Sequence, residues 1–330
     1  MLAPLDDLVQ STRVVELPLV TPFRGLVNRE ALLCEGPNGW SEFSPFIEYD
    51  DAEASLWLAA MLDFGWGPEV QLQRTVVRVN ATIPAVDAAD VAAVLERFPG
   101  CRTVKVKVAE RGQRLTDDVA RVREVRRLLG ATGRIRIDAN GSWNVDEAEH
   151  AVHLLAEFDL EYVEQPCSSV EELGQLRARV KYMGIPVAAD ESVRKASDPL
   201  AVVRAGAADL LVFKAPPLGG VTAALALARD AALPVIVSSA LDTSVGISMG
   251  LHLAGGLAEL DYDCGLGTAA LLGADVTATP LVPVDGVLEV RRVAVDTTLV
   301  DRWAASPERT RWWIQRLERC YRIREAVEAA

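Results

Sequence analysis

The sequence predicts an α/β protein in which repeated strand–helix units close into a barrel, with a smaller α+β cap attached. From about residue 74, short apolar strands alternate with helical patterns, and most of the strands end in a charged or hydroxyl side chain. These polar ends recur at steps of 26, 26, 24 and 24 residues, at Asp138, Glu164, Asp190, Lys214 and Ser238. A strand, a helix and their two connections need about this length, and such repeats close most simply into a barrel.

The first 73 residues lack this alternation and are expected to form the N-terminal part of the cap. Residues 12–20 alternate like a strand, residues 31–35 form another, and residues 51–62 have the apolar spacing of a helix. A loop bounded by Pro22 and Gly25 is expected between the two strands, and it carries Phe23 and Arg24. This loop either reaches over a site or is an ordinary hairpin connection.

Residues 74–280 are expected to form the barrel. Its strands are predicted at residues 75–83, 103–109, 134–140, 160–166, 187–191, 210–213, 235–239 and 262–266. Helices are predicted between them at residues 87–97, 116–129 with a Thr116 cap, 145–158, 170–180, 198–205, 221–232 and 244–260. In residues 281–330 the pattern lapses, and residues 298–327 are expected to form one or two amphipathic helices that pack back on the cap.

Composition excludes several classes of partner. The chain has 330 residues, half of them apolar, which suffices for a large core. Its net charge of -13 argues against nucleic acid and favours a small-molecule substrate. Five scattered cysteines without a Cys-x-x-Cys pattern are typical of reduced thiols. With no leader-like start and no long apolar run, we expect a soluble cytoplasmic protein without membrane partners; the oligomeric state stays open, a monomer included.

Three carboxylates end three consecutive predicted strands. Asp138, Glu164 and Asp190 should therefore stand side by side at the C-terminal rim of the barrel, where such barrels place their catalytic groups. Carboxylate oxygens suit a hard cation such as Mg²⁺, and no His or Cys is placed to recruit zinc. The alternative is that each carboxylate only caps a loop or pairs with an arginine, but three at matching offsets favour a metal site.

Lysines flank these carboxylates on both sides. Lys105 and Lys107 lie on the strand before Asp138, and Lys214 ends the strand after Asp190. A lysine crowded by a second lysine and a divalent ion loses its proton more easily and can act as a base. The alternative is that these lysines only pair with core carboxylates. Lysines on both sides of a metal indicate abstraction of a proton beside a substrate carboxylate, with the metal holding the resulting charge.

Other polar residues are assigned to the structure of the protein. His150 and His153 are three apart on a helix expected outside the barrel, so they are interpreted as surface or packing residues. His252 is expected inside a helix, away from any strand end. Asp261 and Asp263 form an Asp-x-Asp pair near the eighth strand, for which we favour a structural role.

The series Lys-x-Lys, Asp-x-Asn, Glu-Gln-Pro, Asp-Glu and Lys at successive strand ends resembles the enolase superfamily in its muconate lactonizing subgroup. This resemblance implies a modified TIM barrel, (β/α)7β, with an α+β cap built from the N-terminal region and the C-terminal tail. Within the subgroup, the stretches at residues 238–246 and 264–268 resemble the o-succinylbenzoate synthase family of menaquinone biosynthesis. That family implies a carboxylate substrate, 2-succinyl-6-hydroxy-2,4-cyclohexadiene-1-carboxylate, and Mg²⁺, with Mn²⁺ as a substitute, for its dehydration to 2-succinylbenzoate.

The resemblance also implies a role for each matching residue. Lys107 would be the general base that returns its proton to the departing hydroxide, and Lys214 would be the opposite cation. The metal ligands would be Asp138, Glu164 and Asp190, with support from Lys105, Asn140 and Glu191. The succinyl arm would contact Ser238, Ser239, Gly265 and Gly267, and Arg24 or Phe23 would close the site from above.

Other functions stay open on the same scaffold. N-succinylamino acid racemases and dipeptide epimerases share the Lys, Asp, Glu, Asp, Lys series, and the epimerases use an Asp-x-Asp pair to bind a peptide amine. A barrel that only binds a carboxylate ligand or a partner protein would be expected to have lost at least one of the five charged residues, and none is missing. A sugar-acid dehydratase would be expected to have a histidine at a late strand end, where this sequence has none.

Overall fold

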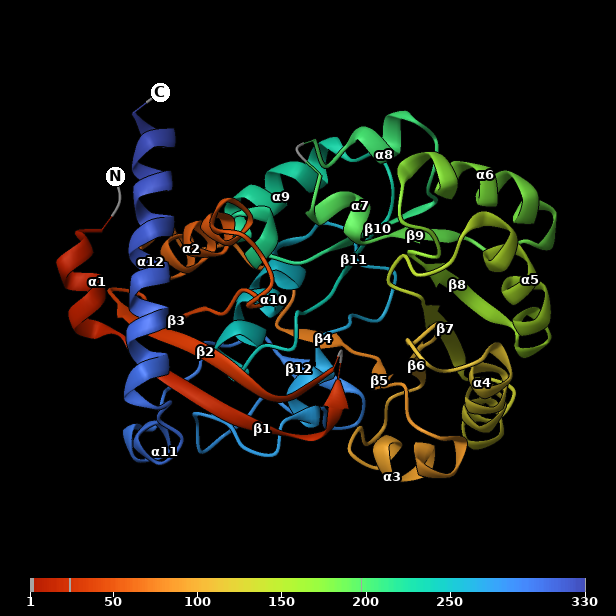
Figure 1. Cartoon of the computed structure of the whole chain (residues 1–330), viewed down its shortest axis with the longest axis horizontal. Coiled ribbons are helices and arrows are strands. Elements are labelled where there is room, and N and C mark those ends of the chain that lie inside the picture. The colour runs from red at the N-terminus through yellow and green to blue at the C-terminus, as the bar shows by residue number, and fades with distance from the viewer. Residues whose placement is uncertain (1–2, 24, 197, 330) are drawn as a thin grey trace.

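The computed structural model describes residues 3–23, 25–196 and 198–329. Its two main sheets are a three-stranded antiparallel sheet and a curled seven-stranded parallel sheet. In Figure 1 the three-stranded sheet and the long C-terminal helix lie on the left, and the barrel lies on the right. The fold predicted from the sequence, a barrel with a cap, is confirmed.

The cap combines segments from both ends of the chain. Its sheet has the order β1 (Arg13–Phe23), β2 (Leu26–Gly36), β3 (Gly39–Phe43), and its helices are α1 (Leu5–Ser11), α2 (Asp51–Trp66), α11 (Thr297–Arg302) and α12 (Pro307–Glu328). The N-cap of helix α2 is Asp50, whose side chain accepts a hydrogen bond from the backbone N–H of Glu53. Helix α12 packs on α2 and β1, as expected for the C-terminal tail.

The first hairpin is longer than the sequence predicted. Strand β1 continues through Pro22 to Phe23, which pairs with Leu26, and the register is irregular between Pro18 and Phe23. Residues 21–23 of the predicted loop at residues 21–25 therefore belong to strand β1, because the pairing resumes beyond the irregularity. Arg24 lies outside the described residues.

The barrel sheet consists of parallel strands in chain order. They are β5 (Ala81–Ile83), β6 (Thr103–Lys107), β7 (Arg134–Asp138), β8 (Leu160–Glu164), β9 (Val187–Ala189), β10 (Leu210–Phe213) and β11 (Val235–Val237). Each strand pairs with its sequence neighbour, so the polar residues at their C-terminal ends meet at one rim.

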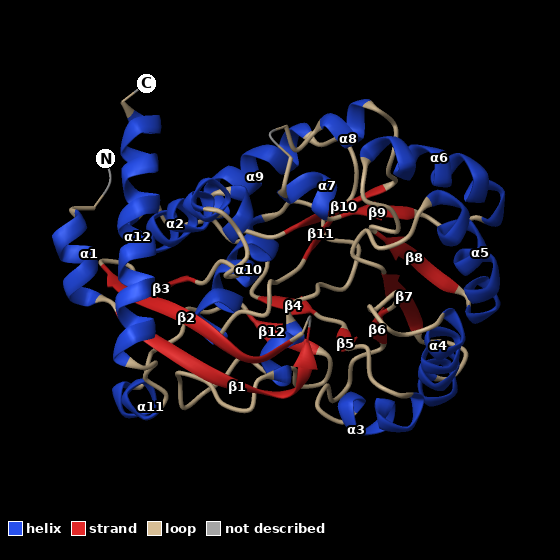
Figure 2. Ribbon diagram, viewed as in Figure 1, coloured by secondary structure: helices blue, strands red, loops and turns tan. Residues whose placement is uncertain are grey.

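Helices cover the outside of the barrel (Figure 2). They are α3 (Val91–Leu95), α4 (Leu115–Leu129), α5 (Val145–Leu155), α6 (Val170–Val180), α7 (Glu191–Arg194), α8 (Ala201–Arg204), α9 (Val221–Asp230) and α10 (Ser244–Gly256). Short 3₁₀ turns accompany them: η1 (Ala88–Asp90), η2 (Ala156–Phe158), η3 (Lys181–Met183), η4 (Pro216–Leu218) and η5 (Gly267–Leu271). Thr116 lies inside α4, and the cap position is Arg114, so the predicted Thr116 cap is wrong. Within the described ranges, no helix combines the length and the apolar character needed to cross a membrane.

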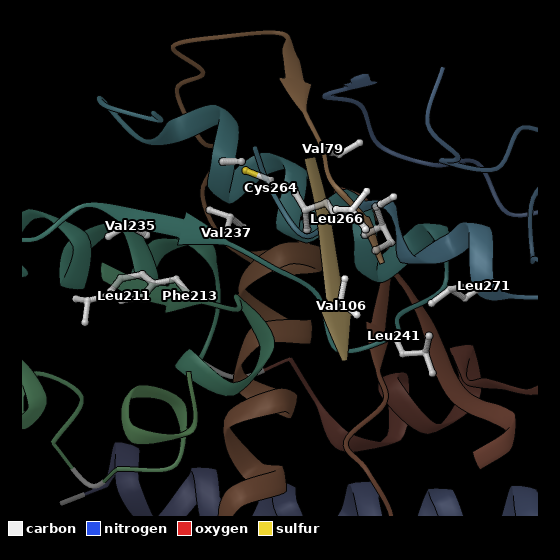
Figure 3. Close-up of a cluster of buried hydrophobic side chains, with 14 of the residues drawn as sticks. Val79, Val106, Leu211, Phe213, Val235, Val237, Leu241, Cys264, Leu266 and Leu271 are labelled. Atoms are coloured by element: carbon white, nitrogen blue, oxygen red, sulfur yellow. The ribbon is translucent and has the colours of Figure 1, made fainter. Parts of the chain in front are cut away.

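The ring closes through an irregular segment instead of a regular eighth strand. The backbone N–H of Cys264 donates to the carbonyl of Arg78, and the N–H of Gly265 donates to the carbonyl of Val237, both at 2.8 Å. Val79 and Cys264 form an isolated parallel bridge, and their side chains lie close together in Figure 3. The predicted first strand is divided because its first half, β4 (Val76–Arg78), pairs with β12 (Val287–Glu289) in a separate antiparallel pair.

The barrel core is apolar between the strands and the helices and polar near the N-terminal ends. Val106, Leu211 and Val237 belong to one large buried cluster, which Figure 3 shows in part. Inside the ring, the fully buried guanidinium of Arg136 donates to Glu161 at 2.5 Å and lies 4.8 Å from the ring of Tyr162. The ion pair satisfies the charge in the barrel interior.

Candidate active site

A cavity of about 550 Å³, including its open mouth, lies where the cap meets the C-terminal ends of the barrel strands. The barrel contributes cations and hydroxyls to its wall: Thr82, Lys105, Lys107, Arg194, Lys214, Ser238, Ser239 and Thr268. The cap contributes aromatic rings: Phe23, Phe46, Tyr49 and Trp57. One wall can therefore bind anionic groups, while the other excludes water from an apolar part of a ligand.

The three predicted carboxylates stand on neighbouring strand ends. Asp138 and Glu164 are directly opposite each other in the register of β7 and β8, and Asp190 follows β9. All three side chains are buried. The ammonium nitrogen of Lys105 lies 2.8 Å from an oxygen of Asp138 and 2.5 Å from an oxygen of Glu164, so these two carboxylates share one cation.

The crowding of negative charge is visible in the pKa values. Burial raises the pKa of Glu164 to about 7, and the neighbouring charges of Asp138 and Asp190 act in the same direction. Burial also works against ionisation of Asp190, but Lys214 and Arg194 outweigh it and lower its pKa to about 2. Extra positive charge at this rim would favour the ionised form of Glu164.

Lys107 lies at the junction of the carboxylates and the cavity. Its ammonium nitrogen donates to Asp138 at 2.5 Å and to the side-chain oxygen of Asn140 at 2.7 Å. The ring centroid of Phe23, at the tip of the cap hairpin, lies 5.6 Å from this nitrogen. Burial lowers the pKa of Lys107 below its ordinary value, the ammonium of Lys105 adds to this effect, and Asp138 opposes it. The side chain is thus oriented and more ready to lose its proton than a free lysine.

The other two lysines pair with the carboxylates. Burial alone would lower the pKa of Lys105, but the carboxylates of Asp138 and Glu164 raise it well above its ordinary value. Lys214 donates to Asp190 at 2.5 Å and lines the cavity. Cationic groups therefore stand at both ends of the row of carboxylates, as the sequence predicted.

The residues around the three carboxylates fit a hard cation in their donor chemistry. One oxygen of Glu191 is buried without a hydrogen-bond partner, while its other oxygen accepts from Asn140 at 3.2 Å and from Arg194 at 2.7 Å. Lysine ammonium groups contact the carboxylates, and no three His, Cys, Asp or Glu side chains of the described chain converge as a complete ligand set. Binding of an ion requires these oxygens to exchange lysine contacts for it.

The predicted substrate contacts are placed in part. Ser238 and Ser239 line the cavity, and the hydroxyl of Ser239 donates to the carbonyl of Gly265 at 2.9 Å. Gly265 also lines it, while Gly267 is not part of the lining, and a Cβ at Gly267 would lie 3.1 Å from the carbonyl oxygen of Asn80. The contact predicted between Gly267 and the substrate stays a prediction. The prediction for Arg24 falls outside the described residues.

Arg194 and Tyr49 are cavity residues that sequence patterns missed. Arg194 ends the short helix α7, is 4% exposed and donates to Asp190 at 3.1 Å and to the hydroxyl of Tyr49 at 3.0 Å. Gln165 was seen only as part of a motif; its buried amide oxygen accepts from the backbone N–H groups of Asp190, at 2.9 Å, and Ser192. The signal for Gln165 in the sequence is its position directly after Glu164. In the structure its φ of 36° lies in the left-handed region.

The residues assigned to structure are located away from the cavity. His153, on the outer face of α5, contacts the hydroxyl of Tyr182, and His150 is exposed. Asp263 is buried and accepts from Arg78 at 2.9 Å and from Thr103 at 2.6 Å, near the N-terminal ends of the strands. These contacts confirm the structural interpretation of Asp263.

Comparison with known proteins identifies the class. The model described as "Enolase C-terminal domain-like" matches residues 87–294, and the "Enolase N-terminal domain-like" model matches residues 14–65. The fold is similar to that of muconate lactonizing enzyme from Pseudomonas fluorescens, with a TM-score of 0.76 and 20% identity over 89% of this chain and 98% of that chain. It is also similar to the L-Ala-D/L-Glu epimerase from Bacillus subtilis, with a TM-score of 0.73 and 21% identity over 86% and 98%. Fold and site together define an enzyme of the enolase superfamily.

More similar relatives specify the family. The o-succinylbenzoate synthase of Mycobacterium ulcerans (strain Agy99) is 51% identical over 97% of this chain and 96% of its own length. That of Mycobacterium tuberculosis (strain H37Rv) is 51% identical over 98% and 97%. The chain belongs to the o-succinylbenzoate synthase family, a family of hydro-lyases within the enolase superfamily.

Proposed function

We propose that this protein removes water from 2-succinyl-6-hydroxy-2,4-cyclohexadiene-1-carboxylate and so produces 2-succinylbenzoate. The observation that carries the proposal is that Lys107 and Lys214, which both line the cavity, pair with Asp138 and Asp190 at the two ends of the row Asp138, Glu164, Asp190. A proton beside a carboxylate is weakly acidic, so its removal needs a base and nearby positive charge.

Lys107 acts as the base and then as the acid. Its neutral amine takes the proton from the ring carbon that carries the carboxylate, and the resulting ammonium donates this proton to the departing hydroxyl group. Both steps use one nitrogen, so water leaves from the face on which the proton was removed. Asn140 and Asp138 accept hydrogen bonds from this nitrogen and hold it in place.

Lys214 supplies fixed positive charge on the other side. Its side-chain nitrogen lies 2.5 Å from an oxygen of Asp190, at the other end of the row of carboxylates from Lys107, and the side chain lines the cavity. Lys105 stays protonated between Asp138 and Glu164 and lowers the proton affinity of Lys107. The negative charge that develops on the substrate is thus met by cations that are in position before the reaction.

Asp138, Glu164 and Asp190 would hold Mg²⁺, or Mn²⁺ in its place. When bound, the ion supplies Lewis acidity toward a substrate carboxylate. Asn140 and Glu191 support this set: the backbone N–H of Asn140 donates to Asp138 at 2.9 Å, and Glu191 shares Arg194 with Asp190. These contacts orient the carboxylates before an ion arrives.

The proposal is tested by comparing two substrates on the same preparation. The cyclohexadiene carboxylate and a set of N-succinyl amino acids are assayed side by side with Mg²⁺ present, following 2-succinylbenzoate formation and loss of optical rotation. We expect a kcat/KM for dehydration that exceeds every value for racemisation. A faster rate on an N-succinyl amino acid would overturn the assignment in favour of a racemase.

A further inference from the structure

One polar atom in the cavity wall has no partner. The indole nitrogen of Trp57, in the middle of α2, is buried and makes no hydrogen bond. The whole residue is only 1% exposed. Among the described residues that line the cavity, Trp57 is the one whose buried polar side-chain atom lacks a partner. A buried donor without an acceptor costs about 1–3 kcal/mol, so it needs an explanation.

The surroundings of Trp57 offer it packing and no acceptor. Its ring packs against Phe46 and Tyr49, with ring centroids 6.4 Å away in both cases. The hydroxyl of Tyr49 is already paired with Arg194. Ala240, from the wall next to Ser239, belongs to the same buried cluster. Phenylalanine would pack in this apolar setting without leaving a donor unpaired. The unpaired N–H therefore indicates that a bound ligand supplies the acceptor.

The lysines of the cavity come from the barrel, and Trp57 comes from helix α2 of the cap. These lysines gather at the strand ends β6 to β10, where they take the ring carboxylate of the substrate. Trp57 lies in the aromatic wall from the cap, beside the segment that carries Ser238 and Ser239. The proposed substrate has a second carboxylate, at the end of its succinyl arm, and this group needs a donor away from the lysines.

We propose that the indole N–H of Trp57 donates a hydrogen bond to the terminal carboxylate of the succinyl arm, an inference that rests on the proposed function. The bond is remote from the reacting carbon, so Trp57 selects and positions the substrate and does not take part in proton transfer. A hydrogen bond to a charged group discriminates strongly against ligands that lack the charge.

The test combines a variant of the protein with a variant of the ligand. Binding of the product 2-succinylbenzoate and of 2-butyrylbenzoate, which lacks the terminal carboxylate, is measured by calorimetry with Mg²⁺ for wild type and Trp57→Phe. We expect the substitution to weaken binding of 2-succinylbenzoate by roughly tenfold or more and of 2-butyrylbenzoate by less than about twofold. In turnover, KM should rise while kcat stays within about threefold.

Trp313→Phe is the matched control, because Trp313 is equally buried but donates to Glu30 within the cap, away from the cavity. It should leave the ratio of the two affinities unchanged. Equal losses for both ligands in Trp57→Phe, or no loss, would overturn the inference while wild-type turnover still supports the proposed function. Absence of 2-succinylbenzoate formation by wild type would overturn both.

A second measurement needs no variant. With ¹⁵N-labelled indole groups, the chain gives resonances from seven tryptophans. One indole N–H signal should move downfield when 2-succinylbenzoate is added and stay in place with 2-butyrylbenzoate. Indole signals that respond identically to the two ligands would contradict a bond to the terminal carboxylate.

Discussion

The hydroxyl of Tyr49 accepts a hydrogen bond of 3.0 Å from Arg194, and the same guanidinium donates to Asp190 at 3.1 Å. Tyr49 belongs to the cap, while Asp190 belongs to the rim of the barrel. One buried side chain therefore connects the position of the cap to the position of a proposed metal ligand. The cap is thus connected to the rim of the barrel as well as covering the cavity.

Removal of this acceptor should destabilise the protein and disturb the rim. Tyr49→Phe leaves a buried guanidinium N–H without its partner, so we expect a loss of about 1–2 kcal/mol in the free energy of unfolding. We also expect a weaker Mg²⁺ affinity, measured by calorimetry. Tyr182→Phe is the control, because Tyr182 is 76% exposed on the outside of the barrel and bonds His153. Equal stability and metal affinity in the two variants would refute the coupling.

Glu42 should make stability depend on pH near neutrality. This buried carboxyl accepts from Ser44, Thr243 and Gly246 at the contact between cap and barrel. Burial raises its pKa to about 7, and Asp242 adds to the effect. The folded state therefore binds a proton that the unfolded state releases above its lower pKa, so this stabilisation is present below about pH 4.5 and is lost as pH rises through about 7.

Glu42→Gln removes this dependence. Wild type should lose stability relative to the variant between pH 5 and 8, by an amount on the order of 3 kcal/mol at most, in urea titrations at each pH. Glu30→Gln is the control of opposite sign. Burial opposes ionisation of Glu30, but Arg309 and Trp313 lower its pKa, so its contribution is lost only as pH falls toward the acid range. A constant difference between wild type and Glu42→Gln would contradict the assignment.

Gly265 has no room for a side chain. A Cβ added at this position would collide with the hydroxyl of Ser238 and would lie 3.1 Å from the Cβ of Ser238. Gly265→Ala should displace Ser238 and raise KM several-fold in steady-state assays, with a smaller change in kcat. Gly174→Ala, within helix α6, provides the comparison. The nearest neighbour of the added Cβ would be the Cβ of Ala207, at 3.6 Å. An unchanged KM in Gly265→Ala would show that Ser238 makes no important substrate contact.

The sequence predicted what depends on local periodicity. The charged rim residues follow from two short-range rules: side chains alternate along a strand, and each strand–helix unit has a similar length. Asp138, Glu164 and Lys214 therefore appeared at regular steps, and the structure places them at one rim. The boundaries of α6 and β10 were also predicted correctly from apolar spacing.

The remainder depends on contacts between segments far apart in the chain. Closure of the ring relies on hydrogen bonds that Cys264 and Gly265 donate to the carbonyls of Arg78 and Val237, which no local pattern encodes. Trp57 looked like an ordinary buried residue of an apolar helix, and its lone donor becomes visible only when the cap meets the barrel. Arg194 lies in a four-residue helix that is too short for a periodic signal.

Removal of the metal should silence the enzyme reversibly. Exhaustive treatment with EDTA should reduce dehydration to background, and Mg²⁺ or Mn²⁺ should restore it, because the rim offers only oxygen ligands at Asp138, Glu164 and Asp190. Calorimetry of Mg²⁺ binding to the metal-free protein gives a second readout, and Asp138→Asn should weaken that binding at least about tenfold. Full activity that survives chelation would count against the metal site.

The role of Lys107 is tested most directly by Lys107→Ala. Removal of the proposed base should lower kcat for dehydration by about a thousandfold or more, while Mg²⁺ affinity and 2-succinylbenzoate binding stay within a few-fold of wild type. Lys105 cannot replace it because Asp138 and Glu164 hold it as a cation, and Lys214 pairs with Asp190 at the other end of the row of carboxylates. Turnover retained within tenfold of wild type would contradict proton transfer by Lys107.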